Sequence, residues 1–221
     1  MKLYAGAESG NSWKIRILLD QLAVPYEQVP VDLLAWEHKS KDFIARLSPR
    51  GQVPVLEDNG HVIWDSGACL VYLARKFDRR DWLPVEPGPM AEVLQWVFMA
   101  ETEIQFGLQY GRRGVMRDRW VIGSKDNQPQ YQALGRMALD AMEARVRSAD
   151  WLAATHITIA DVACFPYVHH APEAGLPLES YPGIQAWLER CRARPHWSPA
   201  PRPPTRHYPD QPAEGRSGDR E

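Results

Sequence analysis

Apolar residues in the first third of the chain follow two different periods. Residues 2–5 and 26–31 are short apolar runs with the length of β-strands. Between them Ile15, Leu18 and Leu22 recur at the spacing of an amphipathic helix. A strand, a helix and a strand with short connections form a right-handed unit whose strands are parallel. The pattern therefore predicts a βαβ unit at the start of the chain.

A hairpin and a helix follow this unit. Residues 53–57 and 61–64 alternate as strands do, and they flank the sequence Asp-Asn-Gly at 58–60, which is typical of a tight hairpin. Asp65 and Ser66 then begin a helix with apolar residues along one side. The order strand, helix, strand, hairpin, helix predicts a domain that combines a sheet with helices.

The pattern changes after residue 78. Residues 79–88 are rich in proline and predict a stiff linker, and every periodic segment beyond them is helical. We therefore predict an α/β domain over 1–78, an all-helical domain over 89–197, and a proline-rich tail over 198–221 that is disordered or lies on the surface.

Four helices are predicted in the second domain. The stripe Val93, Val97 and Ile104 predicts one long helix that ends near residues 111–114. The other three are expected around residues 134–142, after the capping sequence that starts at Thr158, and between Tyr181 and Pro195.

Composition and charge narrow the function. The chain has 221 residues and a formal net charge of −2, from 26 basic and 28 acidic residues. It lacks the broad positive field with which proteins bind nucleic acids or acidic membranes. No window reaches the roughly 18–20 apolar residues of a membrane span, and the first residues do not resemble a signal peptide. We expect a cytoplasmic protein with no nucleic-acid or membrane partner.

Cysteine and histidine do not predict a metal site. Cys69, Cys164 and Cys191 are far apart and are expected to be small buried residues. His169 and His170 are adjacent, and neighbours on a helix point about 100° apart, which makes a poor chelating pair. We expect no metal.

Three polar clusters in the first domain could carry chemistry. The first is Ser9, Asn11 and Ser12, at the turn into the first helix. A helix cap is the simplest interpretation. The alternative is that a hydroxyl donor and the positive end of the helix stabilise a bound thiolate, which is the nucleophilic form of a thiol.

The other two clusters could hold a peptide. Gln52, Val53 and Pro54 begin the third strand, and a cis bond before Pro54 would turn the backbone of Val53 outward to pair with an extended peptide. Asp65 and Ser66 are at a helix start, where free amides bind a carboxylate and Asp65 could pair with an ammonium group. Together the clusters fit a small peptide with a thiol in its middle and an α-amino acid group at one end.

Residues 1 to about 197 resemble the cytosolic glutathione transferases. The similarity is carried by five stretches that occur in the right order: Gly10-Asn11-Ser12-Trp13-Lys14-Ile15-Arg16, Glu37-His38-Lys39, Pro49-Arg50-Gly51-Gln52-Val53-Pro54-Val55-Leu56, Asp65-Ser66 with Leu70-Val71-Tyr72-Leu73, and Thr158-Ile159-Ala160-Asp161-Val162-Ala163.

The resemblance implies a thioredoxin-like domain followed by an all-helical domain, a homodimer, and glutathione as co-substrate for conjugation to an electrophile that is apolar. It implies these contacts with glutathione: His38 and Lys39 with the glycine carboxylate, Gln52 and Val53 with the backbone, Pro54 as the cis proline, and Asp65 and Ser66 with the γ-glutamyl group.

The resemblance also implies a residue beside the sulfur. In serine-type relatives it stands five positions before the basic residue of the first helix, which gives Ser9 when counted from Lys14; Asn11 and Ser12 are the alternatives. An apolar wall for the second substrate is expected from Trp96, Met99, Phe106, Tyr110 and Met116.

Other activities stay open at this point. Asn11 is compatible with a glutathione-dependent peroxidase or disulfide reductase that uses no protein cysteine. A noncatalytic glutathione-binding module is a further alternative. Maleylacetoacetate isomerase is a lesser one, because residues 9–14 share the frame of that class without its cysteine.

Overall fold

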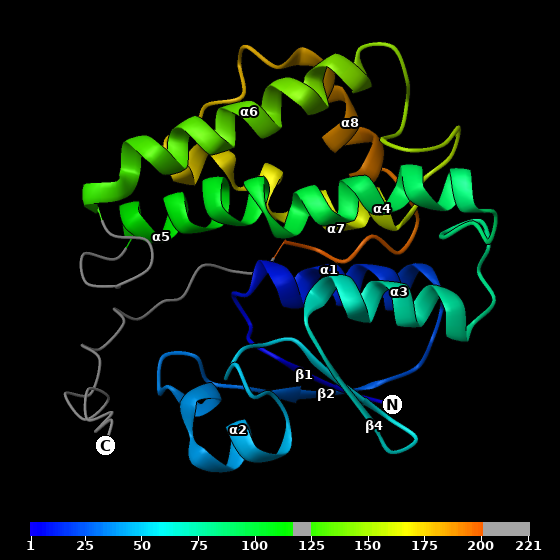
Figure 1. Ribbon diagram of the computed structural model, residues 1–221, viewed down its shortest axis with the longest axis vertical. Helices are drawn as coiled ribbons and strands as arrows, with labels where there is room; N and C mark the ends of the chain where they lie inside the picture. Colours follow the sequence, from blue (N-terminus) through cyan, green and yellow to red (C-terminus); the bar gives the residue numbers. More distant parts are fainter. Residues whose placement is uncertain (117–124, 201–221) are drawn as a thin grey trace.

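A computed structural model describes residues 1–116 and 125–200. In Figure 1 the lower part of the molecule is a small sheet with the helices that pack on it, and the upper part is a layer of helices. The first domain contains, in chain order, β1 (Lys2–Ala5), α1 (Gly10–Gln21), β2 (Glu27–Pro30), α2 (Lys41–Arg46), β3 (Val55–Asp58), β4 (His61–Trp64) and α3 (Ser66–Lys76).

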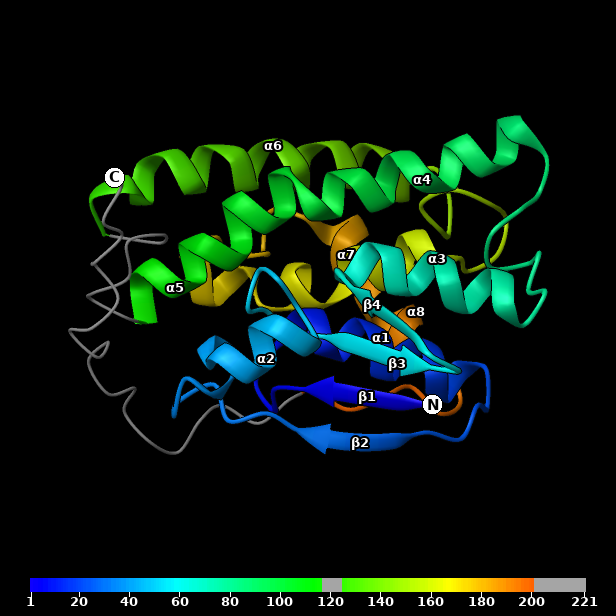
Figure 2. The ribbon, with the colours of Figure 1, turned by 60° about the horizontal axis from the view of Figure 1, so that its bottom comes forward.

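The sheet has the strand order β2-β1-β3-β4. β1 pairs with β2 in parallel, and β1–β3 and β3–β4 are antiparallel; in Figure 2 the arrow of β3 points against those of β1 and β2. The predicted βαβ unit and hairpin are confirmed, and with them the thioredoxin-like fold.

Alternation along the strands divides the core in two. Leu3 and Leu56 face α1 and α3 and belong to the main core, whereas Val55 packs on the other face against Phe43 of α2. Figure 1 accordingly shows α1 and α3 between the sheet and the upper helices, with α2 on the opposite side. α2 is too short, and buries too little, to leave a periodic signal in the sequence.

The second domain is helical where it is described. Its elements are α4 (Pro87–Glu101), a π-helical turn η2 (Gln105–Gln109), α5 (Tyr110–Met116), α6 (Gln128–Val146), α7 (Ile159–His169) and α8 (Pro182–Arg192). α4 begins inside the segment 79–88 that the sequence predicts as a linker.

α7 joins the two domains. Ten consecutive residues of this helix, 159–168, are buried, and α7 packs on both α4 and α1. The rings of Trp13 and Phe165 meet edge to face at 5.3 Å. One apolar core therefore runs through both domains.

The predicted capping box at the start of α7 is present. Asp161 accepts from the backbone of Thr158 at 2.9 Å, and the Thr158 hydroxyl accepts from Ala160. Asp161 also accepts from the amide of Leu152 and from the Trp187 ring, at 3.0 and 2.9 Å. This carboxylate thus organises α7, α8 and the preceding loop, which is more than a cap does.

The start of the predicted tail lies against α1. The Trp13 ring nitrogen donates a buried hydrogen bond of 2.9 Å to the carbonyl of Ser198, and Trp197 packs edge to face on Phe165. Residues 201–221, the rest of that predicted tail, lie outside the described residues.

The prediction of one long helix from about residue 93 to 111–114 is wrong. α4 ends at Glu101, Thr102 has non-helical angles (φ −115°, ψ −94°), and the chain continues through the π-helical turn η2. The apolar stripe continues through the break, because Val97, Ala100 and Ile104 are all buried. Periodicity therefore could not reveal it.

Gly107 in η2 packs directly on the backbone of α6. A Cβ atom at Gly107 would lie 2.6 Å from the Cα of Gly135. Gly107 therefore tolerates no side chain unless η2 and α6 move apart.

We predict that Gly107→Ala destabilises the protein by about 1–3 kcal/mol, because it overpacks a backbone contact that cannot yield. Gly88→Ala in α4 is the matched control, since its Cβ would meet nothing within 4 Å and the change gains helix propensity. Urea unfolding of both variants measures the effect. Equal stabilities would contradict the close contact.

Candidate active site

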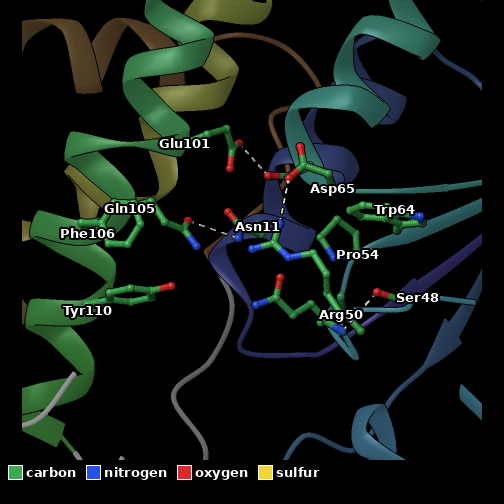
Figure 3. A pocket seen from close by; sticks show the side chains of 13 residues that line it. Asn11, Ser48, Arg50, Pro54, Trp64, Asp65, Glu101, Gln105, Phe106 and Tyr110 are labelled. Carbon is green, nitrogen blue, oxygen red and sulfur yellow. Dashed lines mark hydrogen bonds and ion pairs between the residues drawn. The ribbon is translucent and has the colours of Figure 1, made fainter. Parts of the chain in front are cut away.

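A cleft lies between the first domain and the segment α4–α5 (Figure 3). Its volume is about 220 Å³, below the roughly 300–1,000 Å³ of sites that enclose a ligand. A bound molecule would therefore stay partly in solvent. The lining residues are Asn11, Ser48, Arg50, Gln52, Val53, Pro54, Trp64, Asp65, Ser66, Glu101, Gln105, Phe106 and Tyr110.

The structure separates the three candidates at the start of α1. Asn11 lines the cleft, and its amide nitrogen donates to the Gln105 Oε1 at 3.4 Å. Ser9 is the N-cap of α1 and accepts from the Ser12 amide at 3.1 Å; it is not among the lining residues. Ser12 is fully buried, and its hydroxyl has no hydrogen-bond partner within the described part of the chain.

A phenol lies under the same turn. The Tyr167 ring would be 2.8 Å from a Cβ at Gly10, so α7 supports the start of α1 closely. Burial raises the pKa of Tyr167 to about 12. This hydroxyl is therefore protonated at neutral pH and cannot act as a base there.

The second cluster forms one wall of the cleft. Gln52, Val53 and Pro54 all line it, and the Val53–Pro54 peptide bond is cis. The backbone N–H of Gln52 donates to the Ser48 hydroxyl at 3.3 Å.

The third cluster is the start of α3. Asp65 caps the helix, with its Oδ1 accepting from Gly67 and Ala68 at 3.0 and 3.3 Å. Its Oδ2 is 3.6 Å from the Arg50 guanidinium. Asp65 has φ +91°, a region that L-residues rarely adopt, and such strain gathers at functional sites.

A buried charged network closes the floor. Lys14 of α1 has a fully buried side chain, and its Nζ is 2.8 Å from Glu101 Oε1 of α4 and 3.2 Å from the Ser66 hydroxyl. The Ser66 hydroxyl donates to the same carboxylate oxygen at 2.8 Å. Three helices from two domains thus meet at one ion pair.

Two predicted residues lie outside the cleft lining. His38 and Lys39 belong to a 3₁₀ turn, η1 (Glu37–Lys39); the His38 ring is buried against Trp36, and the Lys39 Nζ donates to the Arg50 carbonyl at 3.1 Å. Burial lowers the pKa of Lys39, and the positive charges of Arg113 and Arg50 lower it further. Positive charge therefore gathers beside the cleft, around Lys39, Arg50 and Arg113.

Of the four expected wall residues whose side chains the structure describes, Phe106 and Tyr110 line the cleft. Trp96 and Met99 pack against the core instead, and the side chain of Met116 lies outside the described residues. An apolar pattern cannot distinguish a pocket from a core, because both need the same residue types.

Sequence reasoning missed the polar side of the helical domain. Glu101 and Gln105 line the cleft, and Arg50 lies beside Asp65. Lys14 could have predicted a buried acidic partner such as Glu101, because a lysine between apolar positions on a helix needs a buried counter-charge. Nothing in the pattern marked Gln105.

The cysteines do not take part in the site. Cys69, Cys164 and Cys191 are all buried, as predicted, and burial raises the pKa of each thiol well above its ordinary value. Within residues 1–116 and 125–200, no three His, Cys, Asp or Glu side chains come together as a metal site would require. None of the helices described here is long and apolar enough to cross a membrane.

A thioredoxin-like domain whose cleft faces an all-helical domain defines the class of the glutathione transferases. Residues 1–75 match the family model described as "Glutathione S-transferase, N-terminal domain", and residues 118–195 match "Glutathione S-transferase, C-terminal domain".

Individual relatives agree with these matches. A crystal structure of a glutathione S-transferase from Pseudomonas fluorescens has a TM-score of 0.82 and 34% identity, over 90% of this chain and 98% of that one. Glutathione S-transferase 2 of Schizosaccharomyces pombe is 29% identical, with 87% of this chain and 91% of the relative covered. The disulfide-bond oxidoreductase YfcG of Escherichia coli is 28% identical, with 86% and 89% covered. The chain belongs to the glutathione S-transferase family.

We predict that Glu101→Gln destabilises the protein by about 3–5 kcal/mol, because it leaves the Lys14 ammonium buried without a counter-charge. The double variant Lys14→Met/Glu101→Gln should recover most of that loss. Asp42→Asn is the control: it breaks an exposed pair with Arg46, worth less than about 1 kcal/mol. Urea unfolding distinguishes these cases, and a cost for Glu101→Gln as small as the control's would exclude a structural role for the pair.

The same pair predicts a pH dependence. Burial raises the pKa of Glu101, but the Lys14 charge and the hydrogen bonds from Lys14 and Ser66 together outweigh it, so the pKa is below its ordinary value. A depressed carboxyl pKa stabilises the fold above the unfolded pKa, about 4.3, and this stability is lost as pH falls through the folded pKa. Below about pH 5, the unfolding free energy should fall less steeply with pH in Glu101→Gln.

Proposed function

We propose that the protein is a glutathione transferase that activates the glutathione thiol for conjugation to an electrophile. The convergence of Asn11, Pro54 and Asp65-Ser66 on one cleft carries this proposal, in a chain of this family. A tripeptide with two carboxylates, one ammonium and a central thiol fits the polar and charged groups that line the cleft or lie beside it. The family membership supports a cytoplasmic enzyme.

The ends of glutathione are held by opposite charges. The γ-glutamyl carboxylate lies beside Ser66 at the start of α3, where the positive end of the helix dipole favours an anion, and the ammonium pairs with Asp65. The central cysteine pairs with the backbone of Val53. The glycine carboxylate lies near His38 and Lys39, where it relieves the repulsion among the cations that lower the pKa of Lys39.

The thiol loses its proton and the sulfur lies beside Asn11. The Asn11 amide donates a hydrogen bond, and the start of α1 adds a favourable potential; both stabilise the thiolate over the thiol. The thiolate then attacks the electrophilic carbon: the carbon–sulfur bond forms, the bond to the leaving group breaks with its electron pair, and the proton has gone to solvent. Phe106 and Tyr110 hold the electrophile in position for this attack.

We predict that Asn11→Ala raises the pKa of bound glutathione and lowers kcat/KM for 1-chloro-2,4-dinitrobenzene at pH 7 by about tenfold. Ser9→Ala should mainly lose a helix cap, about 1 kcal/mol of stability, and Ser12→Ala should leave the thiol pKa unchanged. Ultraviolet titration of the bound thiolate measures the pKa. If Ser9→Ala raises it and Asn11→Ala does not, the sulfur lies at Ser9.

The same enzyme assayed on a glutathione mixed disulfide tests the reductase alternative. Turnover of the disulfide without conjugation of any electrophile would replace the proposal. Tight binding of glutathione with neither activity would make the protein a binding module.

We also propose a homodimer. β4 is an edge strand with Val62 and Trp64 exposed, and Phe98 of α4 is 64% exposed. These apolar side chains lie on two elements that border the cleft, and a second copy would remove them from water.

Light scattering during size-exclusion chromatography is expected to give twice the chain mass for the wild type and a monomer for Phe98→Asp, which buries a charge at the interface. Met137→Asp is the control, since Met137 of α6 is as exposed, at 62%, and should leave the dimer intact. A wild-type monomer would refute the proposal.

A further inference from the structure

Asn11 is held from across the cleft by a residue of the other domain. Its amide nitrogen donates to the Gln105 Oε1 at 3.4 Å (Figure 3), and both side chains line the cleft. We infer that Gln105 is a positioning residue, which orients the Asn11 amide so that its N–H end faces the glutathione sulfur. This inference rests on the proposed function of the same site.

The orientation of this amide decides what it does to a thiolate. The nitrogen end of an asparagine amide donates two hydrogen bonds, and the oxygen end only accepts. If the oxygen faced the sulfur, it would repel the negative charge and raise the thiol pKa. Gln105 accepts one hydrogen of the Asn11 nitrogen, which leaves the second hydrogen for the sulfur.

The described residues offer the Asn11 side chain little other guidance. The Asn11 Oδ1 is buried and has no hydrogen-bond partner in the part of the chain that the structure describes. Among the described residues, the hydrogen bond from the Asn11 nitrogen to Gln105 is what distinguishes the nitrogen end of the amide from its oxygen end. Its loss would let the amide rotate to satisfy its oxygen.

The backbone explains how Gln105 reaches this place. It is the first residue of η2, which follows the break at Thr102, and π-helical turns often occur at functional sites. η2 is wedged on α6 by the close approach of Gly107 to Gly135. The acceptor is therefore carried on a rigid element, as a positioning group has to be.

The neutrality of Gln105 also suits this role. Glu101, one turn earlier, has its charge compensated by Lys14. A carboxylate at position 105 would accept from Asn11 equally well, but its charge would oppose thiolate formation. A glutamine supplies the acceptor without the charge.

The test compares Gln105→Met, which keeps the length of the side chain and removes the acceptor, with Asn11→Ala and the double variant. The pKa of bound glutathione is read from the ultraviolet absorbance of its thiolate, with no electrophile present. We expect Gln105→Met to raise this pKa and to slow conjugation at pH 7 about three- to tenfold, the size of one hydrogen bond. At high pH, where the thiol is ionised in every variant, the rates should converge.

Two comparisons make the result decisive. In the Asn11→Ala background, Gln105→Met should cause no further shift, because its effect passes through Asn11. Gln109→Ala removes a buried glutamine of the same turn that does not line the cleft, and it should leave the thiol pKa unchanged.

An unshifted pKa in Gln105→Met, an additive shift in the double variant, or an equal shift in Gln109→Ala would each overturn the inference. Failure of the proposed function looks different: the wild type would then bind no glutathione or leave its thiol pKa at the value in water.

Discussion

One buried positive charge sets how the two domains meet beside the cleft. The Lys14 ammonium has no exposed surface, and removing such an ion from water costs several kcal/mol unless a counter-charge and hydrogen bonds compensate it. Glu101 and Ser66 provide both. The start of α3 and the end of α4 must therefore meet α1 at this point, and the cleft takes its shape from that meeting.

The cleft is thus built by polar groups on an apolar foundation. α7 supplies the foundation, since it packs on both α1 and α4. The polar contacts then set finer positions: Lys14 with Glu101 at the floor, and Asn11 with Gln105 higher up. Both contacts join the first domain to the second. A shift of α4 or η2 relative to α1 would therefore change the shape of the cleft.

The sequence predicts this fold well because local rules decide most of it. The stripe of α1 and the Asn-Gly turn between β3 and β4 need no knowledge of distant residues. The sequence does not predict the break at Thr102, because the buried stripe continues through it. It does not predict α2 either, because that helix buries chiefly Phe43. Among site residues, Asp65 and Ser66 carry a helix-start signal. Gln105 carries none, because its role arises only when another domain is placed opposite.

The burial of all three cysteines has a consequence for an enzyme that handles electrophiles. Such compounds alkylate any accessible thiolate, and the thiolate fraction falls as the pKa rises. Cys69, Cys164 and Cys191 are buried, with raised pKa values, so under the proposed function no accessible protein thiolate would compete for the electrophile. The only reactive thiol in the active site would then be the one that arrives with glutathione, and the catalyst would survive many turnovers without alkylating itself.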